Sequence, residues 1–97
     1  MAIFITIQIR AKKGMGEDLV SVFEQFTPVA RKEPGNLGIQ LLQSQDDPDE
    51  LMLYQSWESR AHQEAYLVRF EDRGNLEILG PFLDGEPTIG YYTDTKA

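Results

Sequence analysis

The chain has 97 residues, with 16 acidic and 9 basic side chains, one histidine and no cysteine. This length fits a single domain spanning residues 1–97, and the absence of cysteine excludes disulfide scaffolds, thiolate nucleophiles and cysteine-bound metals. The formal net charge of −7 argues against a nucleic-acid partner, because neutralising phosphates requires clustered Lys and Arg.

No apolar run approaches the roughly 18 residues that a membrane span needs. Met1 is followed by Ala-Ile-Phe-Ile, which lacks the basic start of a signal peptide. We therefore expect a cytoplasmic protein without a membrane partner. Because His62 is the sole histidine, multi-histidine metal sites are also excluded, and we expect no metal site.

The first predicted element is a strand over residues 3–9. Isoleucine occupies every second position there, which indicates a strand with one buried face. The Lys12–Gly16 segment has the composition of a turn.

A helix is predicted from Glu17 to about Lys32. Apolar residues recur three and four positions apart and form one stripe, with acidic side chains in the first turn and basic ones in the last. Pro28 lies inside this stripe and predicts a kink, because its ring removes one backbone donor. The Glu33-Pro34-Gly35-Asn36 segment ends the helix.

Two further strands are predicted over residues 37–43 and 51–57, joined by a polar turn into a hairpin. We expect Leu37, Ile39 and Leu41 to share one face of the first, and Leu51, Leu53 and Trp57 to share one face of the second.

Ser59 is a suitable N-cap for a second helix that begins near Arg60 and breaks around residues 72–74. A short helical turn over residues 76–79 and a last strand over residues 86–93 follow. Residues 93–97 form a polar tail that we expect to fray.

The resulting order, β-α-β-β-α-β, predicts an α+β, ferredoxin-like fold whose antiparallel sheet carries both helices on one face. Phe4, Leu42, Met52 and Tyr54 then lie on the helix-free face. Apolar side chains there need a cover, and a second copy of the sheet is the simplest one. We expect a homodimer formed through this face.

Several segments, in their order, resemble one family. They are Lys13-Gly14, the run from Arg31 to Gly35, Asp47-Pro48, the run from Tyr54 to His62, and the run from Gly80 to Leu83. Over almost the whole chain, they resemble the antibiotic biosynthesis monooxygenase (ABM) domain of the dimeric α+β barrel superfamily. The resemblance implies a sheet-to-sheet homodimer with a pocket between sheet and helices in each protomer. It also implies oxidation of phenols, quinols or related aromatics with O₂, without metal or flavin.

The haem-degrading branch of this family matches poorly. By position, its strand-one asparagine falls at Ile7, its distorting tryptophan at Tyr66 and its iron-ligating histidine near Leu76. None of the required residues is present, so the resemblance does not extend to haem degradation.

His62 and Tyr66 are the candidate catalytic residues. His62 is the one side chain whose ordinary pKa suits proton transfer near neutral pH, and a phenol or quinol must lose a proton before its anion reacts with O₂. Tyr66 follows at i+4 on the same helix face and is a candidate positioning donor. The alternatives are a capping or surface role for His62 and an ordinary amphipathic role for Tyr66.

The candidate substrate-binding residues are Trp57, Phe23, Phe26, Phe70 and Ile7, and core packing is the alternative for the aromatic ones. Together these residues predict a cofactor-independent monooxygenase acting on a quinol or polyphenol, with O₂ as co-substrate. The alternatives are a non-catalytic dimeric module that binds a small ligand and a stress-related dimer with a closed core.

Overall fold

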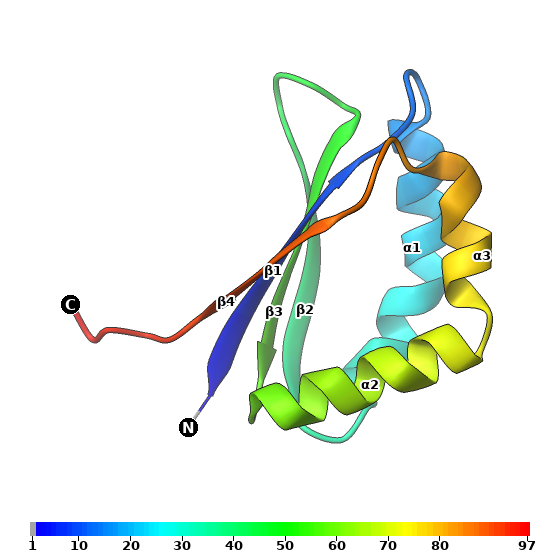
Figure 1. Cartoon of the computed structure of the whole chain (residues 1–97). Helices are drawn as coiled ribbons and strands as arrows, with labels where there is room; N and C mark the ends of the chain where they lie inside the picture. The colour runs from blue at the N-terminus through cyan, green and yellow to red at the C-terminus, as the bar shows by residue number, and fades with distance from the viewer. Residues whose placement is uncertain (1) are drawn as a thin grey trace.

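The computed structural model describes residues 2–97 and follows the predicted order of elements, with one 3₁₀ turn added (Figure 1). The elements are β1 (Ile3–Arg10), α1 (Gly16–Arg31), β2 (Asn36–Gln43), β3 (Glu50–Trp57), α2 (Arg60–Asp72), α3 (Asn75–Leu79), η1 (Gly80–Phe82) and β4 (Thr88–Tyr92).

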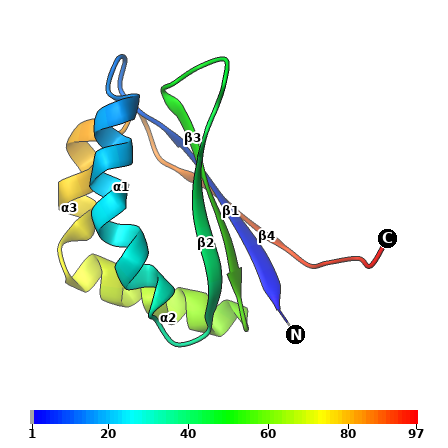
Figure 2. The ribbon, with the colours of Figure 1, turned by 180° about the vertical axis from the view of Figure 1, so that it is seen from behind.

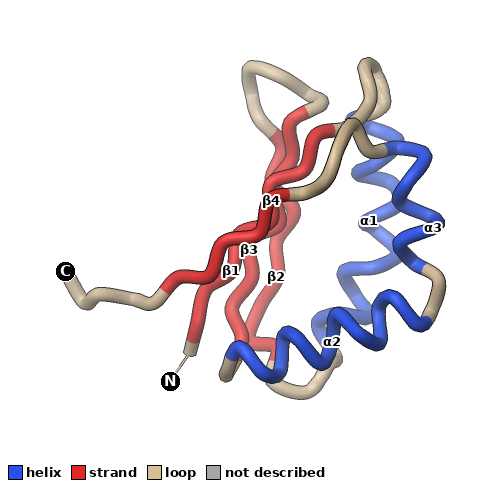
Figure 3. The backbone as a smooth tube through the Cα atoms, in the orientation of Figure 1, coloured by secondary structure: helices blue, strands red, loops and turns tan. Residues whose placement is uncertain are grey.

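The strands form one sheet in the order β2-β3-β1-β4, and every neighbouring pair is antiparallel. The views from the two sides place α1, α2 and α3 on one face of this sheet, while the opposite face carries no helix (Figures 1 and 2). The tube drawing shows the same two layers, with the carboxyl-terminal segment running away from both (Figure 3). The predicted ferredoxin-like α+β fold is confirmed.

The alternation of β1 determines which of its side chains enter the core. Ile5, Ile7 and Ile9 point to the helices and are buried, whereas Gln8 is exposed on the other face. Ile7 lies opposite Leu53 of β3 in the antiparallel register. The isoleucine row therefore forms the floor on which the helices pack.

The prediction for Leu37 is wrong. Leu37 is 55% exposed, because β2 carries an irregularity at its start. Asn36 pairs with Trp57 and Gly38 pairs with Ser56, which leaves Leu37 as an extra residue between them. Such a bulge shifts the alternation by one residue, so that Ile39 is buried while Leu37 is not.

The start of α1 is fixed by the hairpin between β2 and β3. The Asp49 carboxylate accepts hydrogen bonds from the backbone N–H groups of Gly14 and Gly16, each at 2.9 Å. Met15, at the N-cap position, makes no side-chain cap of its own. A Cβ atom on Gly16 would collide with the carbonyl oxygen of Pro48, so the close approach requires glycine.

Helix α1 then continues through Pro28 to Arg31. The predicted N-cap of α2 is confirmed, since the Ser59 hydroxyl accepts a hydrogen bond from the backbone N–H of His62 at 3.2 Å. None of the helices within residues 2–97 has the length and apolar character to cross a membrane.

Candidate functional site

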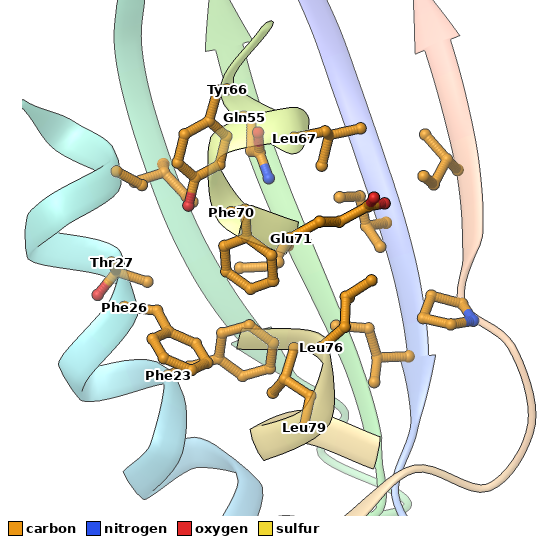
Figure 4. A pocket seen from close by; sticks show the side chains of 17 residues that line it. Phe23, Phe26, Thr27, Gln55, Tyr66, Leu67, Phe70, Glu71, Leu76 and Leu79 are labelled. Carbon is orange, nitrogen blue, oxygen red and sulfur yellow. The ribbon is translucent and has the colours of Figure 1, made fainter. Parts of the chain in front are cut away.

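A cavity of about 120 Å³ lies between the sheet and the three helices (Figure 4). Side chains of 17 residues line it, and every strand and every α-helix contributes at least one. Helix α2 starts at the end of the sheet and runs away from the strands toward α3, and the cavity lies between these helices and the sheet (Figure 1).

The cavity wall is apolar apart from four side chains, which are Thr27, Gln55, Tyr66 and Glu71. Most of the lining residues are buried, but four are exposed and surround the opening, which we call the mouth. The mouth residues are Glu71 at the end of α2, Leu76 of α3, and Pro87 and Ile89 beside and within β4.

Aromatic rings make up much of the wall. Phe23 and Phe26 of α1 meet edge to face with ring centroids 6.0 Å apart, and Phe26 meets Phe70 of α2 in the same way at 5.3 Å. Tyr66 contacts Phe70 at 5.9 Å on one side and Trp57 at 5.3 Å on the other. The spacing of i+3 on α1 and i+4 on α2 brings these rings to one side of each helix.

Tyr66 carries a hydroxyl at one end of this aromatic wall. Burial raises the pKa of Tyr66 to about 12, and the nearby carboxylate of Glu33 adds to the increase. The phenol is therefore protonated throughout the physiological range. It can donate a hydrogen bond to a ligand oxygen, but it cannot serve as a base near neutral pH.

Glu33 connects the end of α1 to α2 through two arginines. Its carboxylate accepts hydrogen bonds from Nε and Nη2 of Arg69 at 3.0 and 2.7 Å, and from Nη2 of Arg73 at 3.1 Å. Burial of Glu33 acts to raise its pKa, but the two arginines outweigh burial and hold the pKa below its ordinary value. This ion pair fixes the position of α2, and hence of Tyr66, relative to α1.

Gln55 is the second polar group of the cavity. Its Oε1 accepts a hydrogen bond from the indole Nε1 of Trp57 at 2.7 Å, and its side chain is buried. Figure 4 shows its amide nitrogen directed toward the surrounding apolar side chains. The indole of Trp57 therefore fixes the orientation of the Gln55 side chain. The amide nitrogen of Gln55 is then available, beside the Tyr66 hydroxyl, as a second hydrogen-bond donor to a ligand.

Gln55 and Glu33 are not among the site residues predicted from the sequence. Gln55 lies two residues after Leu53 and two before Trp57, so the strand period places it in the inward-facing row. A glutamine in such a row is the feature that could have identified it. Glu33 offers no comparable feature, because its arginine partners lie 36 and 40 residues further along the chain.

The structure brings together five of the predicted site residues around the cavity, namely Ile7, Phe23, Phe26, Tyr66 and Phe70. Trp57 lies outside the lining: it is fully buried behind Tyr66 and Gln55. His62 also lies outside the lining.

His62 is engaged at the start of α2. Its Nδ1 lies 2.7 Å from the Ser59 hydroxyl, and its Nε2 lies 3.9 Å from a carboxylate oxygen of Glu58. The imidazole packs so closely on the turn before β2 that a Cβ on Gly35 would collide with it. These contacts match the capping role that was the alternative for this residue.

Within residues 2–97, no three or more His, Asp or Glu side chains are grouped in a way that could hold a metal ion. The chemistry available in the cavity is thus that of two neutral hydrogen-bonding groups, a threonine hydroxyl, and one carboxylate at the mouth.

The chain is similar to a known protein family in sequence and to solved structures in fold. The family model for antibiotic biosynthesis monooxygenases matches residues 2–69. No curated protein shows significant similarity to the chain.

Solved structures match over nearly the full length. A Nitrosomonas europaea protein named for the same family superposes with a TM-score of 0.88 at 18% identity, covering 97% of this chain and 90% of that one. SnoaB, a cofactor-independent oxygenase from Streptomyces nogalater, superposes with a TM-score of 0.83 at 14% identity, covering 99% and 95%. A conserved protein from Methanosarcina mazei gives 0.86 at 17% identity, covering 98% and 94%. At these identities the structures establish a shared fold.

Proposed function

Because the chain belongs to the antibiotic biosynthesis monooxygenase family, we propose that it oxidises a phenolic or quinolic small molecule with O₂, and does so without a metal or an organic cofactor. The observation that carries the proposal is the aromatic-walled cavity with the protonated hydroxyl of Tyr66 and the amide of Gln55 in its lining. The similarity to a cofactor-independent oxygenase supports the absence of a cofactor.

The substrate supplies the electrons in this proposal. A quinol that loses two hydrogens and gains one oxygen atom becomes a hydroxyquinone, and the second oxygen atom leaves as water. No external reductant is therefore required. The chain has to bind the ring, favour its anion and exclude water while O₂ reacts.

Tyr66 and Gln55 perform the second of these tasks. A hydrogen bond from a neutral donor to a substrate oxygen strengthens when that oxygen becomes negative, so it favours the anion over the phenol. Burial of Tyr66 and its raised pKa of about 12 keep it a donor. His62, held by Ser59 at the start of α2, takes no part in this step.

Oxygen uptake with a panel of quinols tests the proposal. We expect consumption above the autoxidation blank for wild type. Tyr66→Phe should lower kcat/KM by roughly tenfold or more, because a hydrogen bond to a charged group is worth about 1.5–3 kcal/mol. Tyr92→Phe is the matched control, because Tyr92 is 57% exposed and lies outside the cavity lining. Uptake no faster than the blank for every quinol would overturn the proposal.

One observation favours a second candidate function, in which the protein binds a small aromatic ligand without turnover. No histidine lines the cavity among residues 2–97, so the site has no base with an ordinary pKa near neutrality. This candidate predicts saturable binding of a quinol without oxygen consumption.

The proposal also includes a homodimer through the helix-free face. Phe4 and Tyr54 stack there with centroids 6.2 Å apart, and Leu42 and Tyr92 are 47% and 57% exposed. A second copy of this sheet would remove these apolar side chains from water. Light scattering coupled to size exclusion should give twice the chain mass, and Tyr54→Glu should shift it toward the monomer. A monomeric wild type would contradict this part of the proposal.

A further inference from the structure

The dimensions and charge of the cavity restrict what it can bind. An enclosed apolar cavity of roughly 150 Å³ accommodates one benzene molecule. The interior of the cavity between the sheet and the helices measures about 120 Å³, which is close to the room that a single ring needs. A substituent on that ring would have to extend through the mouth.

Glu71 is the charged residue at that mouth. It is the one ionisable carboxylate among the lining residues, and no arginine or lysine of residues 2–97 lines the cavity. Within residues 2–97, its carboxylate takes part in no ion pair and no side-chain hydrogen bond, in contrast to Glu33 one helix away. Figure 4 shows the Glu71 side chain extending from α2 toward the strands, with its carboxylate directed away from the phenylalanine rings.

An unpaired carboxylate in this position acts on a ligand substituent through its charge. A second negative charge within several ångströms is disfavoured, and the repulsion is stronger beside an apolar wall than in open water. The formal net charge of −7 of the whole chain acts in the same direction. A substituent with N–H or O–H donors, by contrast, can donate a hydrogen bond to Glu71.

We propose that the cavity accepts single-ring aromatic molecules that enter uncharged, and that Glu71 is the specificity-determining residue that rejects those with an anionic substituent at the mouth. This inference rests on the proposed function only in taking the cavity as the ligand site. It adds a substrate class, a neutral monocyclic phenol or quinol, and assigns a role to a residue that the oxidation chemistry does not use.

Anaerobic calorimetric titration with benzamide and benzoate tests the charge preference, because the two molecules are nearly the same shape and differ in charge. Wild type should bind benzamide about tenfold or more tightly than benzoate. Glu71→Gln should tighten benzoate binding by about tenfold and bring the two affinities closer together, because the glutamine amide oxygen still accepts a hydrogen bond from benzamide while the charge is removed. Glu77→Gln is the matched control, since it removes the same charge from the exposed face of α3, and it should change neither affinity.

Titration with phenol and naphthol tests the size limit, and phenol should bind more tightly. The inference is overturned if benzoate binds as tightly as benzamide, if Glu71→Gln leaves their ratio unchanged, if naphthol binds as tightly as phenol, or if none of these molecules binds. Because these titrations exclude O₂, their result is separate from oxygen uptake: the predicted affinities with no uptake would refute the proposed oxidation and leave this inference standing.

Discussion

The two halves of α2 meet the sheet in different ways. The first half lies over a filled region, where Trp57 is fully buried and Gln63 accepts a hydrogen bond from the Tyr91 hydroxyl at 2.9 Å. The second half, from Tyr66 onward, lies over the cavity and places Glu71 beside the mouth, one residue before the helix ends at Asp72. One helix therefore seals the core at one end and forms the wall of a binding site at the other.

This difference shows why helical periodicity alone did not locate the site. His62 and Tyr66 share a helix face, but four residues advance a helix by about 6 Å along its axis. That advance separates a residue that caps the helix from one that lines the cavity. We call the two regions the filled end and the open end.

The largest expected effect lies at the filled end. Trp57→Ala should lower the free energy of unfolding by about 3–5 kcal/mol, because it removes a fully buried ring and the donor that holds Gln55. Leu76→Ala at the open end should cost less than about 1 kcal/mol, since Leu76 is 49% exposed. Urea denaturation measures both values. Equal losses in the free energy of unfolding would contradict the difference in packing between the two ends.

Blocking the mouth should have the next largest effect, on binding rather than on stability. Leu76→Trp places a large ring at the opening and should weaken benzamide binding by about tenfold or more. Ile78→Trp is the matched control, because Ile78 lies on the same short helix, is 50% exposed and does not line the cavity. Similar binding by the two variants in calorimetry would show that the ligand enters elsewhere.

The Glu33 ion pair joins the open end of α2 to the end of α1 and makes stability depend on pH. Because the pKa of Glu33 is lowered in the folded state, its contribution is present above the ordinary carboxyl pKa of about 4.3 and is lost as the pH falls through the lower folded-state value. Glu33→Gln should therefore cost about 1–2 kcal/mol at neutral pH. Thermal denaturation should show the two proteins converging in acid, and a constant difference across the acid range would contradict this.

The smallest effect is expected at the first turn of α2. Ser59→Ala removes the cap on the backbone N–H of His62 and should cost about 1 kcal/mol. We expect oxygen uptake to be unchanged in Ser59→Ala and in His62→Ala, because neither side chain lines the cavity. Loss of uptake in His62→Ala, measured in a sample shown by circular dichroism to be folded, would restore the histidine as a catalytic candidate.

The fold was predictable because its determinants are local. The alternation of isoleucines in β1, the apolar stripe of α1 and the cap at Ser59 each depend on residues within a few positions of one another. Leu37 was mispredicted because a bulge depends on how β2 pairs with β3, which the strand's own residues do not reveal. The cap on α1 likewise depends on a contact between distant parts of the chain, since Asp49 lies 33 residues from Gly16.

The site was predictable in part. The aromatic stripe residues of the helices were identified, because apolar periodicity selects the side that faces the sheet. The position of the cavity along α2 was not, because it depends on where the helix stands off from the sheet. The role of Glu71 was likewise invisible, since an acidic residue near a helix end resembles any other solvent-exposed carboxylate.

The central claim is that ligands bind at the open end of α2, and an NMR titration with benzamide tests it most directly. We expect shifts in the backbone amides of residues 66–79, which border the cavity, and none in those of residues 59–63 or on the helix-free face. Shifts confined to residues 59–63, or to the strand face that carries Phe4 and Tyr54, would contradict it.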